Sequence, residues 1–248
     1  MRKTIGMLAL GAIVMSTPAS RAAAQGDSVK KASAQGDSTK KGSGMSGMAG
    51  MKGMNPDPDK KIVGTGVPAG FMGRTDSSRF GKGDIQAVRY TNKKGRWEIK
   101  TGPAHIVYSD KDTKSGVYAV SATIEQLEKP AHPEAFGLFV GGQNLDTDQQ
   151  KYTYLLVRGD GKYLIRVRDG KDVNTITEWT ASPAVPKANR AGKATYKLKI
   201  HMAPDTAHFY VNGKMVQAVP KSQISADGIA GLRVNHNLHV VASPVEVK

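Results

Sequence analysis

Residues 151–168, with the sequence KYTYLLVRGDGKYLIRVR, decide the fold. The first arm of this stretch is rich in apolar residues, whereas apolar and charged residues alternate in the second arm. Asp160 and Gly161 separate the arms, and an Asp-Gly pair between two such runs is among the strongest short signals for a β-hairpin. Because side chains alternate along a strand, the second arm turns one set of charged residues to one side. These residues are Lys162, Arg166 and Arg168.

Similar strand signals recur along the chain on both sides of this hairpin. Residues 116–127 and 195–201 alternate between apolar and polar side chains, and 135–141 form an apolar run suited to a central strand. No segment shows sustained helical periodicity, so the pattern predicts an all-β sandwich or barrel. Further candidate strands are 96–100, 105–108, 173–179, 206–211, 215–219, 229–234 and 238–247.

Residues 1–24 have the features of a secretory signal peptide. Arg2 and Lys3 precede a short apolar run at 5–15, and small residues at 22–24 offer a cleavage site. The apolar run is shorter than the ~20 residues that a membrane span needs. The chain has no cysteine, so neither a disulfide nor a bacterial lipid anchor is expected. We therefore expect an exported protein, periplasmic or extracellular, without a transmembrane segment after cleavage.

The net charge indicates the class of partner. Removal of residues 1–24, which hold three basic residues and no acidic one, lowers the formal charge from +15 to +12. Such a charge favours anionic partners, such as acidic polysaccharides, lipid headgroups or acidic protein surfaces, although it also serves solubility. Nucleic acid is not expected, because the protein is exported and shows no binding motif for it.

Residues 25–61 contain few large apolar side chains and are expected to form a disordered tail before a single domain at 62–248. AQGDSVKK at 24–31 recurs as AQGDSTKK at 34–41. Four methionines then follow at a spacing of three residues. Thioethers are soft ligands that favour Cu(I), so they form a candidate copper site, with low-complexity sequence as the alternative. The four are Met45, Met48, Met51 and Met54.

The second half of the chain resembles a known superfamily. The segments WTASPAV (179–185), ATYKLKIH (194–201), TAHFYVNGKMV (206–216) and GIAGLRV (228–234) are similar to the C-terminal half of concanavalin A-like jelly rolls. They resemble most the laminin-G-like and 3-keto-disaccharide-hydrolase-like domains of secreted bacterial proteins. The resemblance, over about 66–248, implies an antiparallel jelly-roll β-sandwich. Since the superfamily holds lectins, glycan-cleaving enzymes and adhesion modules, it does not choose among these functions.

Basic residues on two strands form the main candidate binding surface. Lys162, Arg166 and Arg168 leave one strand, and Lys197 and Lys199 leave another. If both strands belong to one sheet, they create a basic face suited to acidic sugars, lipids or proteins; a solvated outer face is the alternative. Trp179, for stacking on a sugar, and Asn144, in a polar loop, complete the candidate ligand residues.

Asn144, Asp146 and Asp148 place oxygen ligands at alternate positions of a loop. These residues form a candidate calcium site of the lectin kind, with a polar turn as the alternative, and apart from this candidate no cofactor is expected. An EF-hand is excluded, because Gln149 and Leu155 replace its required Gly and Glu. The histidines, including His236 and His239 three residues apart, are expected at surfaces or strand edges rather than at a metal.

Three functions follow from these observations. The first is an exported, non-catalytic module that binds carbohydrate at the cell envelope. The second is an accessory or structural subunit that docks on a larger periplasmic or membrane protein complex. The third is a glycan-processing hydrolase of the 3-keto-disaccharide type. The sequence lacks the Glu-x-Asp-x-x-Glu pattern of glucanases, and Glu98 and Glu178 are expected on separate strands, so we assign no catalytic residue.

Overall fold

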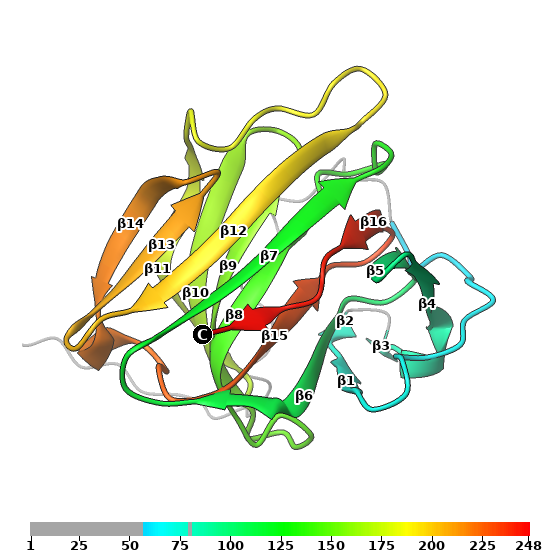
Figure 1. The fold of residues 1–248 in the computed structure, drawn as a ribbon. Coiled ribbons are helices and arrows are strands. Elements are labelled where there is room, and N and C mark those ends of the chain that lie inside the picture. The colour runs from blue at the N-terminus through cyan, green and yellow to red at the C-terminus, as the bar shows by residue number, and fades with distance from the viewer. Residues whose placement is uncertain (1–56, 79–80) are drawn as a thin grey trace, which may run out of the picture. The chain divides into compact units, whose positions relative to one another are not determined.

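The computed structural model describes residues 57–78 and 81–248. In this part of the chain two large antiparallel β-sheets pack face to face (Figure 1). The prediction of an all-β antiparallel sandwich is therefore confirmed. The described residues all belong to one compact unit. The predicted signal peptide, the four methionines and most of the predicted tail lie outside the described residues.

The first sheet is built around the hairpin at residues 151–168. Leu155 of one arm lies opposite Ile165 of the other, as a hairpin requires. The connection consists of residues 159–161, and Gly161 has φ +90°, which favours glycine. In spatial order this seven-stranded sheet contains β1 (Met72–Thr75), β6 (His105–Lys114), β15 (Gly228–Val234), β8 (Ala135–Gln143), β9 (Lys151–Arg158), β10 (Lys162–Asp169) and β11 (Asp172–Ala181).

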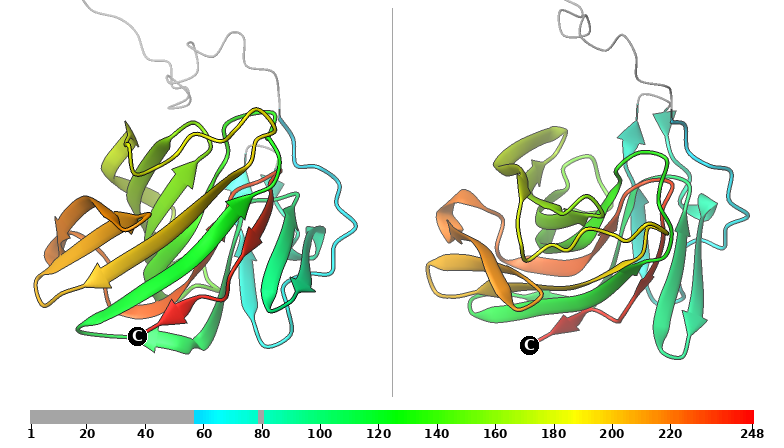
Figure 2. Two further views of the ribbon diagram at one scale, coloured as in Figure 1. Left: turned by 45° about the horizontal axis from the view of Figure 1, so that its top comes forward. Right: turned by 90° about the horizontal axis from the view of Figure 1, so that it is seen from above.

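The second sheet has eight strands and forms the other layer, as the two views in Figure 2 show. Its order is β14 (Lys214–Pro220), β13 (Thr206–Val211), β12 (Ala194–Met202), β7 (Tyr118–Gln126), β16 (His239–Ala242), β5 (Arg96–Thr101) and β4 (Val88–Lys93), and β17 (Glu246–Val247) pairs with β7. The smaller elements are the pair β2 (Ser77–Ser78) and β3 (Gly81–Lys82) and the 3-10 helices η1 (Ile85–Ala87) and η2 (Lys221–Gln223).

The main core lies between the two sheets and follows the predicted alternation. Tyr196, Leu198 and Ile200 of β12 are buried there, and the ring of Phe136 meets that of Tyr196 edge-on at 5.5 Å between centroids. A second apolar cluster covers the outer face of the seven-stranded sheet, so β9 is buried on both faces. This second cluster contains Ile106, Tyr108, Ala135, Phe139, Leu145, Tyr152, Tyr154, Leu156 and Leu164.

Candidate functional site

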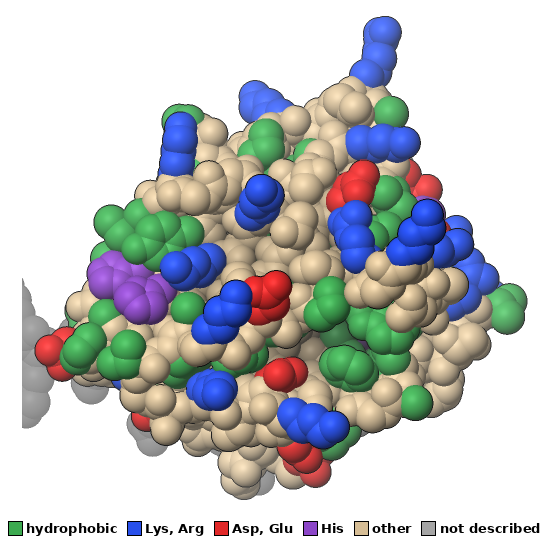
Figure 3. Space-filling view, viewed as in Figure 1, with side chains coloured by type: hydrophobic (Ala, Val, Ile, Leu, Met, Phe, Trp, Pro, Cys, Tyr) green, Lys and Arg blue, Asp and Glu red, His purple; other side chains and the backbone are tan. Residues whose placement is uncertain are grey.

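A shallow groove of about 570 Å³ crosses the outer face of the eight-stranded sheet, over β7, β12 and β13. Because β12 buries alternate residues, Lys197 and Lys199 project from the sheet on this side. Figure 3 shows this face, on which lysine and arginine side chains are widely spread. We call this groove the basic groove. Its residues include Ser121, Thr123, Lys197, Lys199, Tyr210 and Glu246.

Strand register brings the polar side chains of the basic groove together. Ser121 of β7, Lys199 of β12 and Tyr210 of β13 are consecutive cross-strand neighbours, and Glu246 of β17 lies opposite Ser121. The Lys199 ammonium lies 5.6 Å from the centre of the Tyr210 ring. Such neighbours on one face lie close enough to contact a single small ligand. The groove therefore offers a hydroxyl, an ammonium and an aromatic ring in one line.

The two lysines of the basic groove, Lys197 and Lys199, form no ion pair within the described part of the chain. Among the described residues, no carboxylate lies within ion-pair distance of the Nζ atom of Lys197 or Lys199, and Glu246 pairs with Lys248 at 2.9 Å. Unpaired lysines on one face attract anions from solution. The basic groove is therefore suited to a ligand that carries negative charge.

Two histidines extend this face beside the groove. His201 of β12 lies opposite His208 of β13, and their rings stack at 5.9 Å between centroids with an interplanar angle of 21°. The His208 ring is also 6.5 Å from that of Tyr210. Together they form a continuous ring surface, visible in part as the purple patch in Figure 3.

The other predicted basic residues lie on the opposite side of the sandwich. Lys162, Arg166 and Arg168 belong to β10 of the seven-stranded sheet, whereas Lys197 and Lys199 belong to β12 of the eight-stranded sheet. A single basic face that contains all five therefore does not form. The alternation itself was predicted correctly in both strands, since each basic residue leaves its sheet on the outer side.

The arginines of the seven-stranded sheet are matched with carboxylates. Arg166 pairs with Glu178 at 3.6 Å, and Arg168 lies 3.8 Å from Asp76. Asp76 also pairs with the buried Arg233. Burial alone would raise the pKa of Asp76, but the charge of Arg233, its hydrogen bond and the charge of Arg168 together lower that pKa.

Trp179 is also part of this outer face. Its ring packs against the second apolar cluster and lies under the Arg158 guanidinium, 4.1 Å away. Arg158 is held in turn by two hydrogen bonds to Asp160, of 3.0 and 2.6 Å. An arginine of the same chain thus lies over the Trp179 ring, and stacking of Trp179 on a sugar stays a prediction.

The predicted calcium loop lies at the surface between β8 and β9. Arg74 donates a hydrogen bond to the Asp146 carbonyl oxygen at 2.8 Å and pairs with the Asp148 carboxylate at 2.6 Å. Asn144 adopts φ +51°, as asparagine often does in a turn. An arginine beside the loop opposes the binding of a cation there, and the calcium site remains a prediction.

Several groove residues did not enter the sequence-based list, namely Ser121, Thr123, Tyr210 and Glu246. A signal for Tyr210 was present, because the alternation in 206–211 turns Phe209 inward and hence Tyr210 outward. The sequence did not indicate which strands are neighbours in the sheet, so the residues beside Lys199 could not be predicted.

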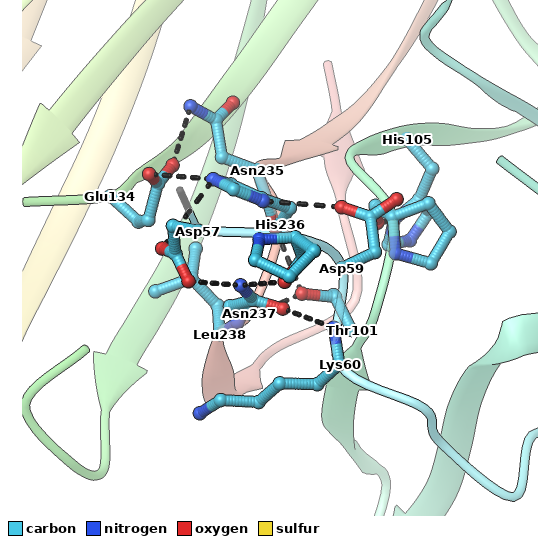
Figure 4. A network of polar contacts seen from close by, with 12 residues as sticks. Asp57, Asp59, Lys60, Thr101, His105, Glu134, Asn235, His236, Asn237 and Leu238 are labelled. Atoms are coloured by element: carbon cyan, nitrogen blue, oxygen red, sulfur yellow. Dashed lines mark hydrogen bonds and ion pairs between the residues drawn. The ribbon is translucent and has the colours of Figure 1, made fainter. Parts of the chain in front are cut away.

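A second polar constellation lies at one end of the sandwich, where the described chain begins (Figure 4). His236, just after β15, contacts Asp59 through Nδ1 at 3.1 Å and Glu134 through Nε2 at 2.8 Å. The hydrogen bond to Glu134 raises the pKa of His236, although burial opposes the shift. The Lys60 amide donates to Asn237 Oδ1 at 2.7 Å. Residues 57–60, predicted as part of a disordered tail, are thus held on the sandwich.

Comparisons with known proteins bear on the fold. No protein-family model and no curated protein matches the sequence. Sheep galectin-11, solved with glycerol, is similar with 13% identity and a TM-score of 0.39 over 55% of this chain and 92% of its own. The carbohydrate-binding module CBM66 from Bacillus subtilis is similar with 14% identity and a TM-score of 0.45, over 72% and 95%.

An alginate lyase of polysaccharide lyase family 7 is similar with 11% identity and a TM-score of 0.43, over 70% of this chain and 84% of the lyase. At these identities and TM-scores the similarity identifies neither a family nor a ligand for this chain. The finer resemblance to laminin-G-like and 3-keto-disaccharide-hydrolase-like domains remains a prediction. Within residues 57–78 and 81–248, no helix has the length and apolar character to cross a membrane.

Proposed function

We propose that this protein is an exported, non-catalytic module that binds an acidic carbohydrate of the cell envelope in the basic groove. The observation that carries this proposal is the line of Ser121, Lys199 and Tyr210, with the unpaired Lys197 beside it. A tyrosine ring can stack on the apolar face of a sugar, and the hydroxyl can exchange hydrogen bonds with sugar hydroxyls. The two ammonium groups attract a uronate or another acidic substituent.

The acids near the groove favour binding over hydrolysis. Of the described residues that line the basic groove, Glu246 is the one carboxylate, whereas glycoside hydrolysis requires two carboxyl groups ~5 to 9 Å apart. Glu98 and Glu178, each beside a tryptophan in the sequence, lie in different sheets. Glu98 contacts His239 and Glu178 pairs with Arg166. The proposal therefore assigns no catalytic role to these residues.

The test measures binding of the full chain to polygalacturonate and to neutral dextran at low and at physiological salt. We expect binding to polygalacturonate alone, weaker at higher salt because salt screens exposed charges. The double variant Lys197→Gln, Lys199→Gln should lower the affinity about tenfold, since each exposed charge contributes up to ~1 kcal/mol. Tyr210→Ala should weaken binding further. Lys162→Gln, a lysine on the opposite sheet, is the matched control and should leave the affinity unchanged.

Two results would refute the groove as the binding site. One is equal affinity of the double lysine variant and the unaltered protein, and the other is loss of binding in Lys162→Gln. Retention of an envelope protein without any polysaccharide would favour the docking-subunit alternative instead. Release of shortened sugars would favour the glycan-processing alternative.

A further inference from the structure

We propose that Asp57, Glu134 and His236 bind a divalent transition-metal ion, with Zn²⁺ as the best match to their donor atoms. One donor atom from each of the three residues lies within 4.8 Å of the other two. Asp57 belongs to the segment before β1, Glu134 immediately precedes β8, and His236 follows β15 (Figure 4). The fold therefore gathers the three side chains from segments that are far apart in the sequence. We call these three residues the metal cluster.

The metal cluster has an organised outer shell. His236 turns Nε2 towards the other two residues and Nδ1 towards Asp59, 3.1 Å away. Glu134 turns Oε1 to His236, while its Oε2 accepts a hydrogen bond from Asn235 at 3.2 Å. A histidine that binds a metal through one ring nitrogen usually donates its other N–H to a carboxylate or carbonyl, which fixes the ring orientation.

Asp57 is also held by a hydrogen bond from outside the cluster, and one of its carboxylate oxygens is placed to bind a cation. Its Oδ1 accepts a hydrogen bond from Asn237 Nδ2 at 3.0 Å. Its Oδ2 lies 4.0 Å from His236 Nε2, is buried from solvent and accepts no hydrogen bond within the described part of the chain. A buried carboxylate oxygen without a hydrogen-bond partner is unfavourable, and a bound cation would satisfy it.

The geometry fits a small, four-coordinate ion. The Nε2 atom of His236 is 2.8 Å from Glu134 Oε1 and 4.0 Å from Asp57 Oδ2. These distances bracket the about 3.3 Å expected between donors around a tetrahedral ion with bonds of 2.0–2.1 Å. One imidazole and two carboxylates suit zinc with a water as fourth ligand, whereas calcium takes six to eight oxygen ligands.

The site is within reach of solvent. Glu134 also lines a cavity of about 380 Å³ at this end of the sandwich, together with Asp160 and Arg190. An ion bound here would join residue 57 to the start of β8 and the end of β15. The metal cluster would thus fix the start of the sandwich domain in place, independently of what the basic groove binds.

The experiment uses the full chain without an affinity tag, freed of metal with a chelator. Zinc binding is measured by calorimetry, and Co²⁺ is used as a probe because its visible absorption reports four-coordinate ligation. We expect one site whose affinity falls at least about 100-fold in His236→Gln and in Glu134→Gln, and about tenfold in the outer-shell variant Asp59→Asn. Circular dichroism of each variant without metal checks that it is folded.

His239→Gln is the matched control. His239 also lies between two carboxylates, Glu98 at 2.8 Å and Glu128 at 3.5 Å, but they face opposite ring nitrogens and cannot share one ion. Its replacement should leave zinc binding unchanged. The proposal is overturned if no zinc binds to the unaltered protein, if folded His236→Gln retains the affinity, or if His239→Gln loses as much as His236→Gln.

Discussion

Replacement of Asp76 by asparagine tests how the outer face of the seven-stranded sheet is held together. Asp76 pairs with Arg233, which is 6% exposed, and Arg233 also donates a hydrogen bond to the Tyr152 hydroxyl at 2.9 Å. Removal of one member of a buried ion pair leaves an uncompensated charge and typically costs ~3–5 kcal/mol. Because asparagine keeps one oxygen acceptor, we expect a loss near the lower limit, about 3 kcal/mol.

The assay is the urea-induced unfolding midpoint of Asp76→Asn beside a matched control. In Glu178→Gln the lost charge pairs with Arg166 at 3.6 Å but is 73% exposed, so its loss should cost less than about 1 kcal/mol. The double variant Asp76→Asn, Arg233→Met should recover much of the stability, because it removes the stranded charge as well. Equal midpoints for Asp76→Asn and Glu178→Gln would refute the reasoning.

Three further predictions concern other positions. Burial lowers the pKa of His105 to about 4, so between pH 6.5 and 4 the unfolded chain binds a proton that the folded chain does not. The free energy of unfolding should therefore fall by about 3 kcal/mol over this range. In His105→Asn the urea unfolding midpoint should depend much less on pH. Gly137→Ala places a Cβ 1.9 Å from the Leu155 carbonyl oxygen of the neighbouring strand, so the unfolding free energy should fall by about 3 kcal/mol, and a change near zero would contradict this close approach. Asn212 accepts a hydrogen bond from the backbone and donates one to Ala184, so Asn212→Ala should cost about 2 kcal/mol in thermal unfolding, whereas Asn212→Asp should lose less.

Local pattern was enough to predict most strands of the sandwich. The alternation at 195–201 identified β12 and the face that it buries, and the Asp-Gly pair located the β9–β10 hairpin. These features follow from neighbours in the sequence, since strand periodicity and turn chemistry are local properties. The weakly patterned region 62–95 gave no firm strand, although β1 and β4 lie there.

The arrangement of the strands could not be predicted in the same way. Whether β10 and β12 share a sheet depends on long-range pairing, and the prediction of one basic face depended on that unknown. The metal cluster was missed for the same reason. His236 was recognised only as one of two closely spaced histidines, while Asp57 and Glu134, which the fold brings to it, are 179 and 102 residues away along the chain.

The order of strands also constrains when the protein can fold. β15 is the central neighbour of β6 and β8 in one sheet, and β16 fills the place between β7 and β5 in the other. Both come from residues 228–242, close to the end of the described chain. Neither sheet can be completed until this segment has been synthesised. Strand pairing between residues that are far apart in the sequence is also slow. We therefore expect that the sandwich is completed only after residues 228–242 have been synthesised, and that removal of these residues would leave both sheets open at the centre rather than shorten one edge.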